Sequence, residues 1–187
     1  MGWMELFEEI AACERCPLSA GRTFTVPGEG DPDAPLMLVG EGPGAEEDRL
    51  GRPFVGASGQ LLTALLGEIG LSRRQVYIAN VVKCRPPGNR TPTPDEAEQC
   101  MRYLRAQFTL VKPRALVLLG GTAAKYVLGG DVRIRRDHGR WSQRKGLWMM
   151  PTYHPSAMLR DVQQKREAFG DFQSIAQKLR ELEDAKV

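Results

Sequence analysis

The sequence contains no long apolar run and no recognisable secretion signal. None of its apolar stretches approaches the ~18 consecutive residues that a membrane span requires. Residues 1–5 offer neither the basic segment nor the hydrophobic stretch that begins a signal peptide. Internal repeats and low-complexity segments are also missing. These absences argue against a membrane partner, and they predict a cytoplasmic protein.

The chain also lacks a strong charge of either sign. It has 26 Lys and Arg residues against 23 Asp and Glu residues, a net charge of +3, which is too mild to indicate nucleic-acid binding by itself. One segment differs, because residues 133–145 contain six basic residues and a single acid, Asp137. That segment is either a phosphate-facing strip or a solvated hairpin.

Apolar residues make up 42% of the 187 residues, enough to bury a core, and we expect a monomer with one domain over residues 1–187. Four continuous apolar runs bounded by turn residues are typical of buried parallel strands: residues 36–40, 76–82, 115–120 and 147–150. Helical spacing of apolar residues is found in residues 4–11, 58–69, 94–111, 122–128 and 169–182.

Local signals refine these elements. Thr93, Pro94 and Glu96 form a capping box that begins the third helix. A hairpin is expected around His138 and Gly139, from residues 133–137 and 140–143. Strands that alternate with helices predict an α/β fold, a three-layer α/β/α sandwich with a central, mostly parallel four-stranded sheet.

The four cysteines have the spacing of a metal centre. Cys13 and Cys16 form a C-x2-C pair after the first helix, Cys84 follows a strand, and Cys100 lies two turns into a later helix. Thiols in a reducing compartment seldom form disulfides. Four thiolates suit either tetrahedral Zn²⁺ or a [4Fe–4S] cluster. Spacing leaves that choice open, and it also leaves open two core cysteines beside a chance C-x2-C pair.

A loop rich in glycine and proline follows the first predicted strand. It reads Gly-Glu-Gly-Pro-Gly over residues 40–44 and continues to Gly56, with Glu41, Glu47 and Phe54 within it. Glycines at a strand end let a ligand approach the backbone closely, and this edge of an open α/β sheet is where ligands bind. The other interpretation is a plain connection between strand and helix.

Two scarce polar residues fall at the same edge. The chain has only two histidines and two asparagines, and Asn80 interrupts an apolar strand while His154 follows the last one. A buried amide without a partner costs ~1–3 kcal/mol. Separately, Asn80 could cap local backbone and His154 could be a core histidine. Their coincidence with Glu41, Glu47 and Phe54 at the strand ends favours a binding site.

The chemistry of this set suits a nucleobase. The ring of Phe54 can stack on a base, and the amide of Asn80 offers one donor and one acceptor to a base edge. A donor on His154 can stabilise charge that develops on a base carbonyl. A carboxylate can stabilise an oxocarbenium-like sugar or align a water molecule.

Three motifs follow one another along the chain: GEGPG…ED…GRPFVG…GQ within residues 40–60, NVVKCRPP…NR within residues 80–90, and HPS at residues 154–156. Together they resemble the family 4, iron–sulfur uracil-DNA glycosylases, and with the cysteine pair the match covers nearly the whole chain. The resemblance implies a monofunctional DNA glycosylase of base excision repair. Such an enzyme hydrolyses the N-glycosidic bond of uracil in DNA, releases uracil and leaves an abasic site. The partner is therefore uracil-containing DNA, single- or double-stranded.

The resemblance also implies roles for individual residues. It implies that a [4Fe–4S] cluster is held by Cys13, Cys16, Cys84 and Cys100. The uracil pocket comprises Gly40, Glu41, Gly42, Pro43, Phe54, Asn80, Asn89 and His154. The DNA-facing residues are Ser156, Met158, Leu159 and Arg160. Leu159 or Met158 is the wedge that fills the gap left by the flipped base, and Arg160 holds a phosphate.

One departure concerns the catalytic carboxylate. Family 1 glycosylases carry an Asp at the position that Gly42 occupies here. We therefore expect Glu47 to take the charge role and Glu41 to position the loop or the water. A related group is trapped covalently through a His in the loop after the Asn strand; residues 85–94 contain none, so turnover is expected. Lys83 is expected to point away from the pocket, towards solvent or a DNA phosphate.

Three other functions stay open. The first is a non-catalytic module of the same fold that binds uracil or damaged DNA, which turnover on uracil-containing DNA would separate. An Fe–S electron carrier would be indifferent to mutation of Asn80. A zinc-ribbon nucleic-acid module would be excluded by a brown colour in the purified protein.

Overall fold

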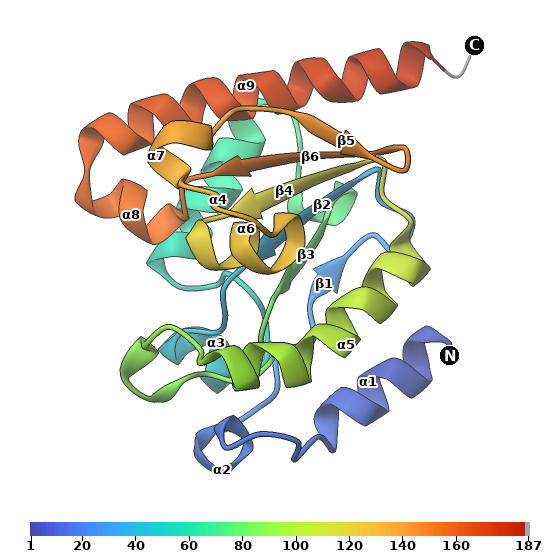
Figure 1. The fold of residues 1–187 in the computed structure, drawn as a ribbon, viewed down its shortest axis with the longest axis vertical. Helices are drawn as coiled ribbons and strands as arrows, with labels where there is room; N and C mark the ends of the chain where they lie inside the picture. Colours follow the sequence, from blue (N-terminus) through green and yellow to red (C-terminus); the bar gives the residue numbers. More distant parts are fainter. Residues whose placement is uncertain (186–187) are drawn as a thin grey trace.

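The computed structural model describes residues 1–185 and has a six-stranded sheet at its centre, in the order β1-β3-β2-β4-β6-β5 (Figure 1). The four central strands are parallel: β3 (Tyr77–Asn80), β2 (Leu36–Gly40), β4 (Ala115–Leu119) and β6 (Leu147–Thr152). The predicted α/β sandwich is confirmed. The predicted single domain also includes residues 186 and 187, which lie outside the described residues.

Two short antiparallel strands extend the predicted four-stranded sheet, one at each edge. They are β1 (Glu29–Gly30), which pairs with β3, and β5 (Ser142–Arg144), which pairs with β6. The first has only two residues, and all three residues of the second are exposed. Neither strand therefore carries the apolar pattern by which the sequence indicates a strand.

Helices cover both faces of the sheet, and side-chain alternation decides which helix meets which residue. Their bounds are α1 (Trp3–Ala11), α2 (Leu18–Gly21), α3 (Ala45–Leu50), α4 (Ala57–Glu68), α5 (Pro94–Val111), α6 (Gly121–Leu128), α7 (Ile134–Asp137), α8 (Pro155–Arg160) and α9 (Val162–Asp184), with 3₁₀ turns η1 (Arg73–Gln75) and η2 (Pro87–Asn89). Met37 and Val39 of β2 pack with α1, α5 and α6, whereas Leu36 and Leu38 pack with α4, α8 and α9. None of the helices in residues 1–185 is long and apolar enough to cross a membrane.

The predicted start of α5 is confirmed at atomic detail. The hydroxyl of Thr93 accepts the backbone N–H of Glu96 at 3.3 Å, and the Glu96 carboxylate accepts the N–H of Thr93 at 2.8 Å. This reciprocal pair satisfies two N–H groups that a helix start leaves free. The cap fixes where α5 begins, and thereby where Cys100 lies along it.

The predicted hairpin around His138 and Gly139 is wrong. Residues 134–137 form the helical turn α7, whose start is held because the Asp137 carboxylate accepts the backbone N–H of Arg133 at 2.8 Å. The hairpin lies later, between β5 and β6, where Lys145 and Gly146 both have positive φ angles, 50° and 84°. Two consecutive left-handed residues are what a tight hairpin turn requires.

Candidate active site

A cavity of about 190 Å³ opens where β2, β3 and β6 end. Its lining residues are Glu41, Gly42, Pro43, Gly44, Glu47, Phe54, Ser58, Asn80, Pro86, Asn89, Arg90, His154 and Ser156. Parallel strands bring these segments together because their carboxyl ends share one edge of the sheet. Gly40 and Asn80 are direct partners in the register of β2 and β3. The structure thus brings the predicted pocket residues to one place, with Gly40 in the strand that bears the loop.

Asn80 lies at the floor of this cavity with an unmet polar atom. Its side chain is 1% exposed, and its Oδ1 is buried without a hydrogen-bond partner among the described residues. A Cβ on Gly40 would lie 2.5 Å from that oxygen and 2.5 Å from the ring of Phe54. Glycine is therefore required at position 40 if the amide and the ring are to lie side by side. A buried, unpaired acceptor is costly, so it points to a ligand that supplies the donor.

Phe54 forms one wall of the cavity in an unusual backbone conformation. Its φ angle is +50°, in the left-handed region that non-glycine residues seldom adopt. The side chain is 6% exposed, and its ring centroid lies 5.6 Å from that of His154. The two rings are tilted by 33°. An aromatic face beside a buried amide is suited to a flat heterocycle.

His154 is placed as the N-cap of α8. Its Nδ1 accepts the backbone N–H of Ser156 at 3.1 Å and lies 2.8 Å from the Ser156 hydroxyl. Burial, followed by the nearby positive charge of Arg160, lowers the pKa of His154 to about 4. The imidazole is therefore neutral at pH 7. Because Nδ1 accepts a backbone N–H, the ring proton resides on Nε2, which can donate to a ligand.

Both predicted glutamates line the cavity, and each is anchored by one oxygen. Oε1 of Glu47 accepts the backbone N–H groups of Val55 and Gly56, both at 3.0 Å. An oxygen of Glu41 accepts a short hydrogen bond from the hydroxyl of Thr122 at the start of α6. Two different elements therefore hold the carboxylates: the loop after Phe54 holds Glu47, and α6 holds Glu41.

Sequence reasoning assigned no role in the site to Thr122 or to four of the lining residues. The four are Gly44, Ser58, Pro86 and Arg90. A signal for Thr122 existed, since it follows Gly120 and Gly121 directly after an apolar strand, the same arrangement that marks Glu41 and His154. Arg90 is held by the buried Glu96 at 2.7 Å, a partner that α5 supplies and that the sequence pattern does not indicate.

The predicted DNA-facing residues divide into two groups. Ser156 lines the cavity, and Leu159 is 52% exposed on α8. Met158 is only 2% exposed and packs in the core beneath α8 and α9. Met158 cannot reach DNA from that position, which corrects its assignment as a possible wedge. Residues three or four apart share a helix face, so the neighbours Met158 and Leu159 point in different directions.

Asn89 and the basic strip are also ordered by local contacts. Asn89 ends η2 with a φ angle of 57°, and its Oδ1 accepts the Nε–H of Arg85 at 2.8 Å.

In the basic strip over residues 133–145, Arg133 and Arg136 pair with Asp131 and Asp137. Part of the positive charge that the sequence indicated is therefore neutralised locally.

Lys83 points away from the cavity, but it does not reach solvent. The side chain is 1% exposed, and Nζ donates to the backbone oxygen of Asn80 at 2.8 Å and to Oε1 of Gln107 at 2.7 Å. Burial lowers the pKa of Lys83 to about 8. The expectation that Lys83 faces solvent or a DNA phosphate was wrong, because α5 covers this side of β3 and supplies a buried partner.

All four cysteines line a second, smaller cavity between α1, α2 and α5. They are free thiols, with Cys84 and Cys100 buried. The backbone N–H of Lys83 donates to Sγ of Cys100 at 3.2 Å, and Nη1 of Arg22 donates to Sγ of Cys84 at 3.4 Å. Burial raises the pKa of Cys84 and raises that of Cys100 to about 11. Within residues 1–185, no group of three or more His, Cys, Asp or Glu side chains is arranged to hold a metal ion.

Comparison with known proteins covers most of the chain. Residues 27–180 match the uracil DNA glycosylase superfamily. The type-4 uracil-DNA glycosylase of Thermotoga maritima is 48% identical over 158 residues, which cover 82% of this chain and 81% of that protein. The type-4 enzyme of Sulfurisphaera tokodaii is 44% identical, covering 90% of this chain and 80% of its own. The type-4 enzyme of Archaeoglobus fulgidus is 42% identical, and the match covers 92% of this chain and 91% of that protein. The superfamily match includes every residue that lines the 190 Å³ cavity.

Proposed function

The chain belongs to the uracil DNA glycosylase superfamily, and we propose that it acts as a type-4 enzyme that hydrolyses the N-glycosidic bond of uracil in DNA. It is a DNA-repair hydrolase whose substrate is uracil-containing DNA. One observation of the site carries the proposal: the buried Oδ1 of Asn80 has no hydrogen-bond partner within residues 1–185 and lies beside the ring of Phe54. Uracil supplies both the missing donor and a flat ring.

Selection of uracil is assigned to Asn80. Uracil presents an N3–H donor beside its O4 acceptor, so Oδ1 of Asn80 accepts the first and Nδ2 donates to the second. Cytosine presents a bare N3 acceptor beside an amino donor, which opposes the same amide orientation. A site built around a buried polar pair discriminates strongly, because the wrong base leaves both partners unpaired. Stacking on Phe54 contributes affinity for any flat base and leaves the choice to the amide.

Stabilisation of the leaving group is assigned to His154. Breaking the glycosidic bond leaves negative charge on the uracil ring. A neutral imidazole whose Nε2 carries the proton can donate to a uracil carbonyl as that charge develops. The low pKa of His154 supports this role, because the neutral imidazole at pH 7 already carries the Nε2 proton that it donates.

Different catalytic roles are assigned to Glu47 and Glu41. A Cβ on Gly42 would lie 2.7 Å from Cγ2 of Val82, so the family 1 Asp could not be placed at position 42 unless Val82 moved. We assign the oxocarbenium-stabilising charge to Glu47, whose anchored Oε1 fixes its orientation beside Gly44. Glu41, held by Thr122, is assigned to positioning the water or the loop.

The reaction is proposed to be monofunctional. A bifunctional glycosylase needs an amine that forms a Schiff base with the sugar. No lysine is among the residues of 1–185 that line the cavity, and the nearby Lys83 is engaged by Asn80 and Gln107. The product is therefore an intact strand with an abasic site, cleaved only on heating in base. Borohydride trapping of a protein–DNA adduct, lost in Lys83→Ala, would contradict this assignment.

The four cysteines are proposed to hold a [4Fe–4S] cluster. All four line one cavity, so their side chains could turn towards a group that needs four thiolates, although within residues 1–185 they are not already arranged as a metal site. The N–H donors of Lys83 and Arg22 fit sulfurs that carry negative charge. Cys13 and Cys16 of the N-terminal segment would share the cluster with Cys84, after β3, and Cys100, on α5, and the cluster would thereby tie these segments together. Zinc is the competing occupant, and iron analysis with visible absorption of the purified protein distinguishes the two.

Contact with DNA is proposed to run along α8. Exposed Leu159 is assigned as the wedge for the gap left by the flipped nucleotide, and the adjacent, exposed Arg160 is assigned to bind a phosphate. Base extrusion costs unstacking energy, which the wedge and the pocket together offset.

The decisive experiment is release of free uracil from a synthetic oligonucleotide that contains one uracil, in single- and double-stranded form, beside a cytosine control. We expect uracil release, no cytosine release and an alkali-labile product strand. Binding to uracil-containing DNA without release would support the non-catalytic module instead.

A further inference from the structure

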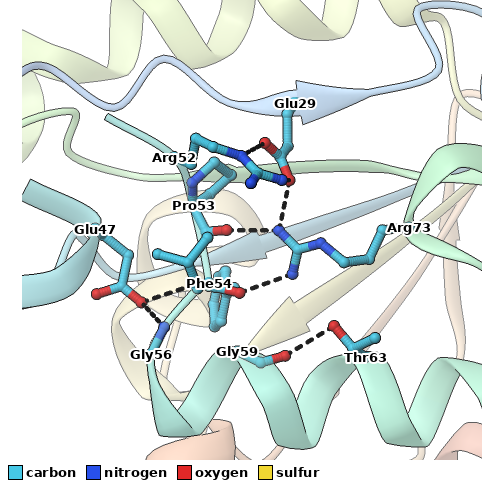
Figure 2. Close-up of polar contacts among 10 residues, drawn as sticks. Glu29, Glu47, Arg52, Pro53, Phe54, Gly56, Gly59, Thr63 and Arg73 are labelled. Atoms are coloured by element: carbon cyan, nitrogen blue, oxygen red, sulfur yellow. Dashed lines mark hydrogen bonds and ion pairs between the residues drawn. The ribbon is translucent and has the colours of Figure 1, made fainter. Parts of the chain in front are cut away.

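Arg73 lies outside the uracil cavity, yet it is bonded directly to the backbone of the cavity wall. It belongs to η1, between α4 and β3, and its side chain is 17% exposed. Nη1 donates to the carbonyl of Phe54 at 2.8 Å, and Nη2 donates to the carbonyl of Pro53 at 2.6 Å (Figure 2). One guanidinium thus binds two consecutive carbonyls, which a planar fork of donors can do and an ammonium cannot.

The guanidinium is itself held from the other side. Nη2 of Arg73 also donates to Oε1 of Glu29 at 2.7 Å. Arg52 binds the same carboxylate through Nε at 2.8 Å and Nη2 at 3.0 Å. Figure 2 shows Glu29 between the two arginines and Arg73 between Glu29 and the loop. Within residues 1–185, Arg52 donates to Glu29 and to no carbonyl of this loop, so Arg73 is the member of the ion cluster that hydrogen-bonds to Phe54.

The loop needs such support because its conformation is unfavourable. Phe54 has a φ angle of +50°, where a bulky side chain is strained. On the far side, Glu47 accepts the N–H groups of Val55 and Gly56, and Figure 2 shows the bond to Gly56. A Cβ on Gly59 would lie 1.7 Å from the carbonyl oxygen of Phe54, so only glycine lets α4 approach this closely. The carbonyl side of the wall is therefore fixed by Arg73 and the amide side by Glu47.

We infer that Arg73 is a positioning residue, which holds the strained backbone of Phe54 so that its ring is presented to the flipped base. The inference rests on the proposed function, since it assigns Phe54 as the stacking surface. Arg73 acts through Phe54 and does not touch the substrate. Without the fork, Phe54 is expected to relax out of the left-handed region and to swing its ring away from Asn80.

The test uses Arg73→Met, which keeps the length of the side chain and removes its donors. Competitive inhibition by free uracil measures the pocket without the DNA contacts. Losing a base–aromatic stack typically weakens binding by ~5- to ~150-fold, and we expect Arg73→Met to raise the inhibition constant of uracil by about tenfold. Arg73→Lys, which keeps the charge but lacks the fork, should be similarly impaired. It also serves as the second variant if Arg73→Met does not fold.

Two matched controls separate this effect from a change of charge or of stability. Arg74→Met removes the adjacent, exposed arginine, and Arg52→Met removes the other partner of Glu29. Both should keep the uracil inhibition constant within about twofold, as is usual for surface substitutions. In a double-mutant cycle, Arg73→Met should add little to Phe54→Ala, because its effect requires the ring. Additive effects, or an unchanged inhibition constant in both Arg73 variants, would overturn the inference.

A readout that is independent of uracil keeps the two proposals distinguishable. Incorporation of fluorophenylalanine labels the six phenylalanines, and Phe54→Leu assigns the signal of Phe54. That fluorine signal should shift or broaden in Arg73→Met and stay unchanged in Arg74→Met. A wild-type protein that neither releases nor binds uracil would overturn the proposed function, whereas an unmoved signal would overturn the role of Arg73.

Discussion

Replacement of Asn80 by alanine is expected to destroy uracil excision while leaving the free protein as stable as before, or slightly more stable. Oδ1 of Asn80 is buried and has no partner among the described residues, and the side chain is 1% exposed. An unsatisfied buried acceptor costs ~1–3 kcal/mol, which the alanine variant no longer incurs. The small cavity that the substitution leaves offsets part of this gain.

The net change in stability is expected to lie between zero and about +1 kcal/mol, which raises the Tm of a protein of this size by up to about 4 °C. Uracil release should fall by ~10²-fold or more, because the site loses the amide that pairs with the base edge. Thermal melting and single-turnover uracil release, measured on the same preparation, test both halves. Activity and stability thus change in opposite directions, as expected where a functional group is held unsatisfied.

Asn80→Asp is the matched isosteric comparison. It keeps the shape and the acceptor but loses the donor for uracil O4, and it places an ionisable group in a buried position. We therefore expect low activity together with a lowered Tm. If Asn80→Ala melted more than about 4 °C below wild type, the amide would have to be supporting the local fold. The inference of an unpaired oxygen awaiting a ligand would then be refuted.

Four further predictions concern the chemistry and the cysteines. Because the pKa of His154 is lowered to about 4, the imidazole stays neutral, and activity should persist from pH 8 to about pH 5. A loss of activity centred near pH 6.5, at which the protein still melts as it does at pH 8, would contradict a neutral histidine. His154→Ala should lower the single-turnover rate by ~10²–10³ with little change in DNA affinity, the usual cost of losing one oxyanion donor. Glu47→Gln should lower turnover more than Glu41→Gln in single-turnover assays, and the reverse order would exchange their roles. Cys84→Ala should yield a colourless protein with a lower Tm, whereas full iron content and wild-type melting would remove Cys84 from the ligand set.

Much of the architecture could be predicted because it depends on short-range pattern. The parallel strands are recognisable in the sequence as apolar runs. The bounds of β2 match the prediction, those of β4 and β6 differ by one or two residues at one end, and β3 is shorter than predicted at both ends. The start of α5 followed from Thr93 and Glu96, whose capping bonds are local. Strand order then brought Gly40, Asn80 and His154 to one edge, since parallel strands must end on the same side. The candidate pocket could therefore be predicted from the sequence.

Contacts between side chains that lie far apart in the sequence could not be predicted from the sequence. The hairpin prediction failed because the segment around His138 is held by Asp171 on α9, at 2.9 Å, a partner that local pattern does not indicate. Met158 and Leu159 look alike as apolar neighbours, and only packing against α9 decided that one is core and the other exposed. Lys83 was expected to face solvent or a DNA phosphate and is buried, because Gln107 on α5 offers its oxygen. The hydrogen bond from Arg73 to the carbonyl of Phe54 likewise joins residues 19 apart, one on each side of α4. Local free energies select strands, caps and turns within a few residues, whereas burial and long-range hydrogen bonds exist only once the sheet and its helices have assembled.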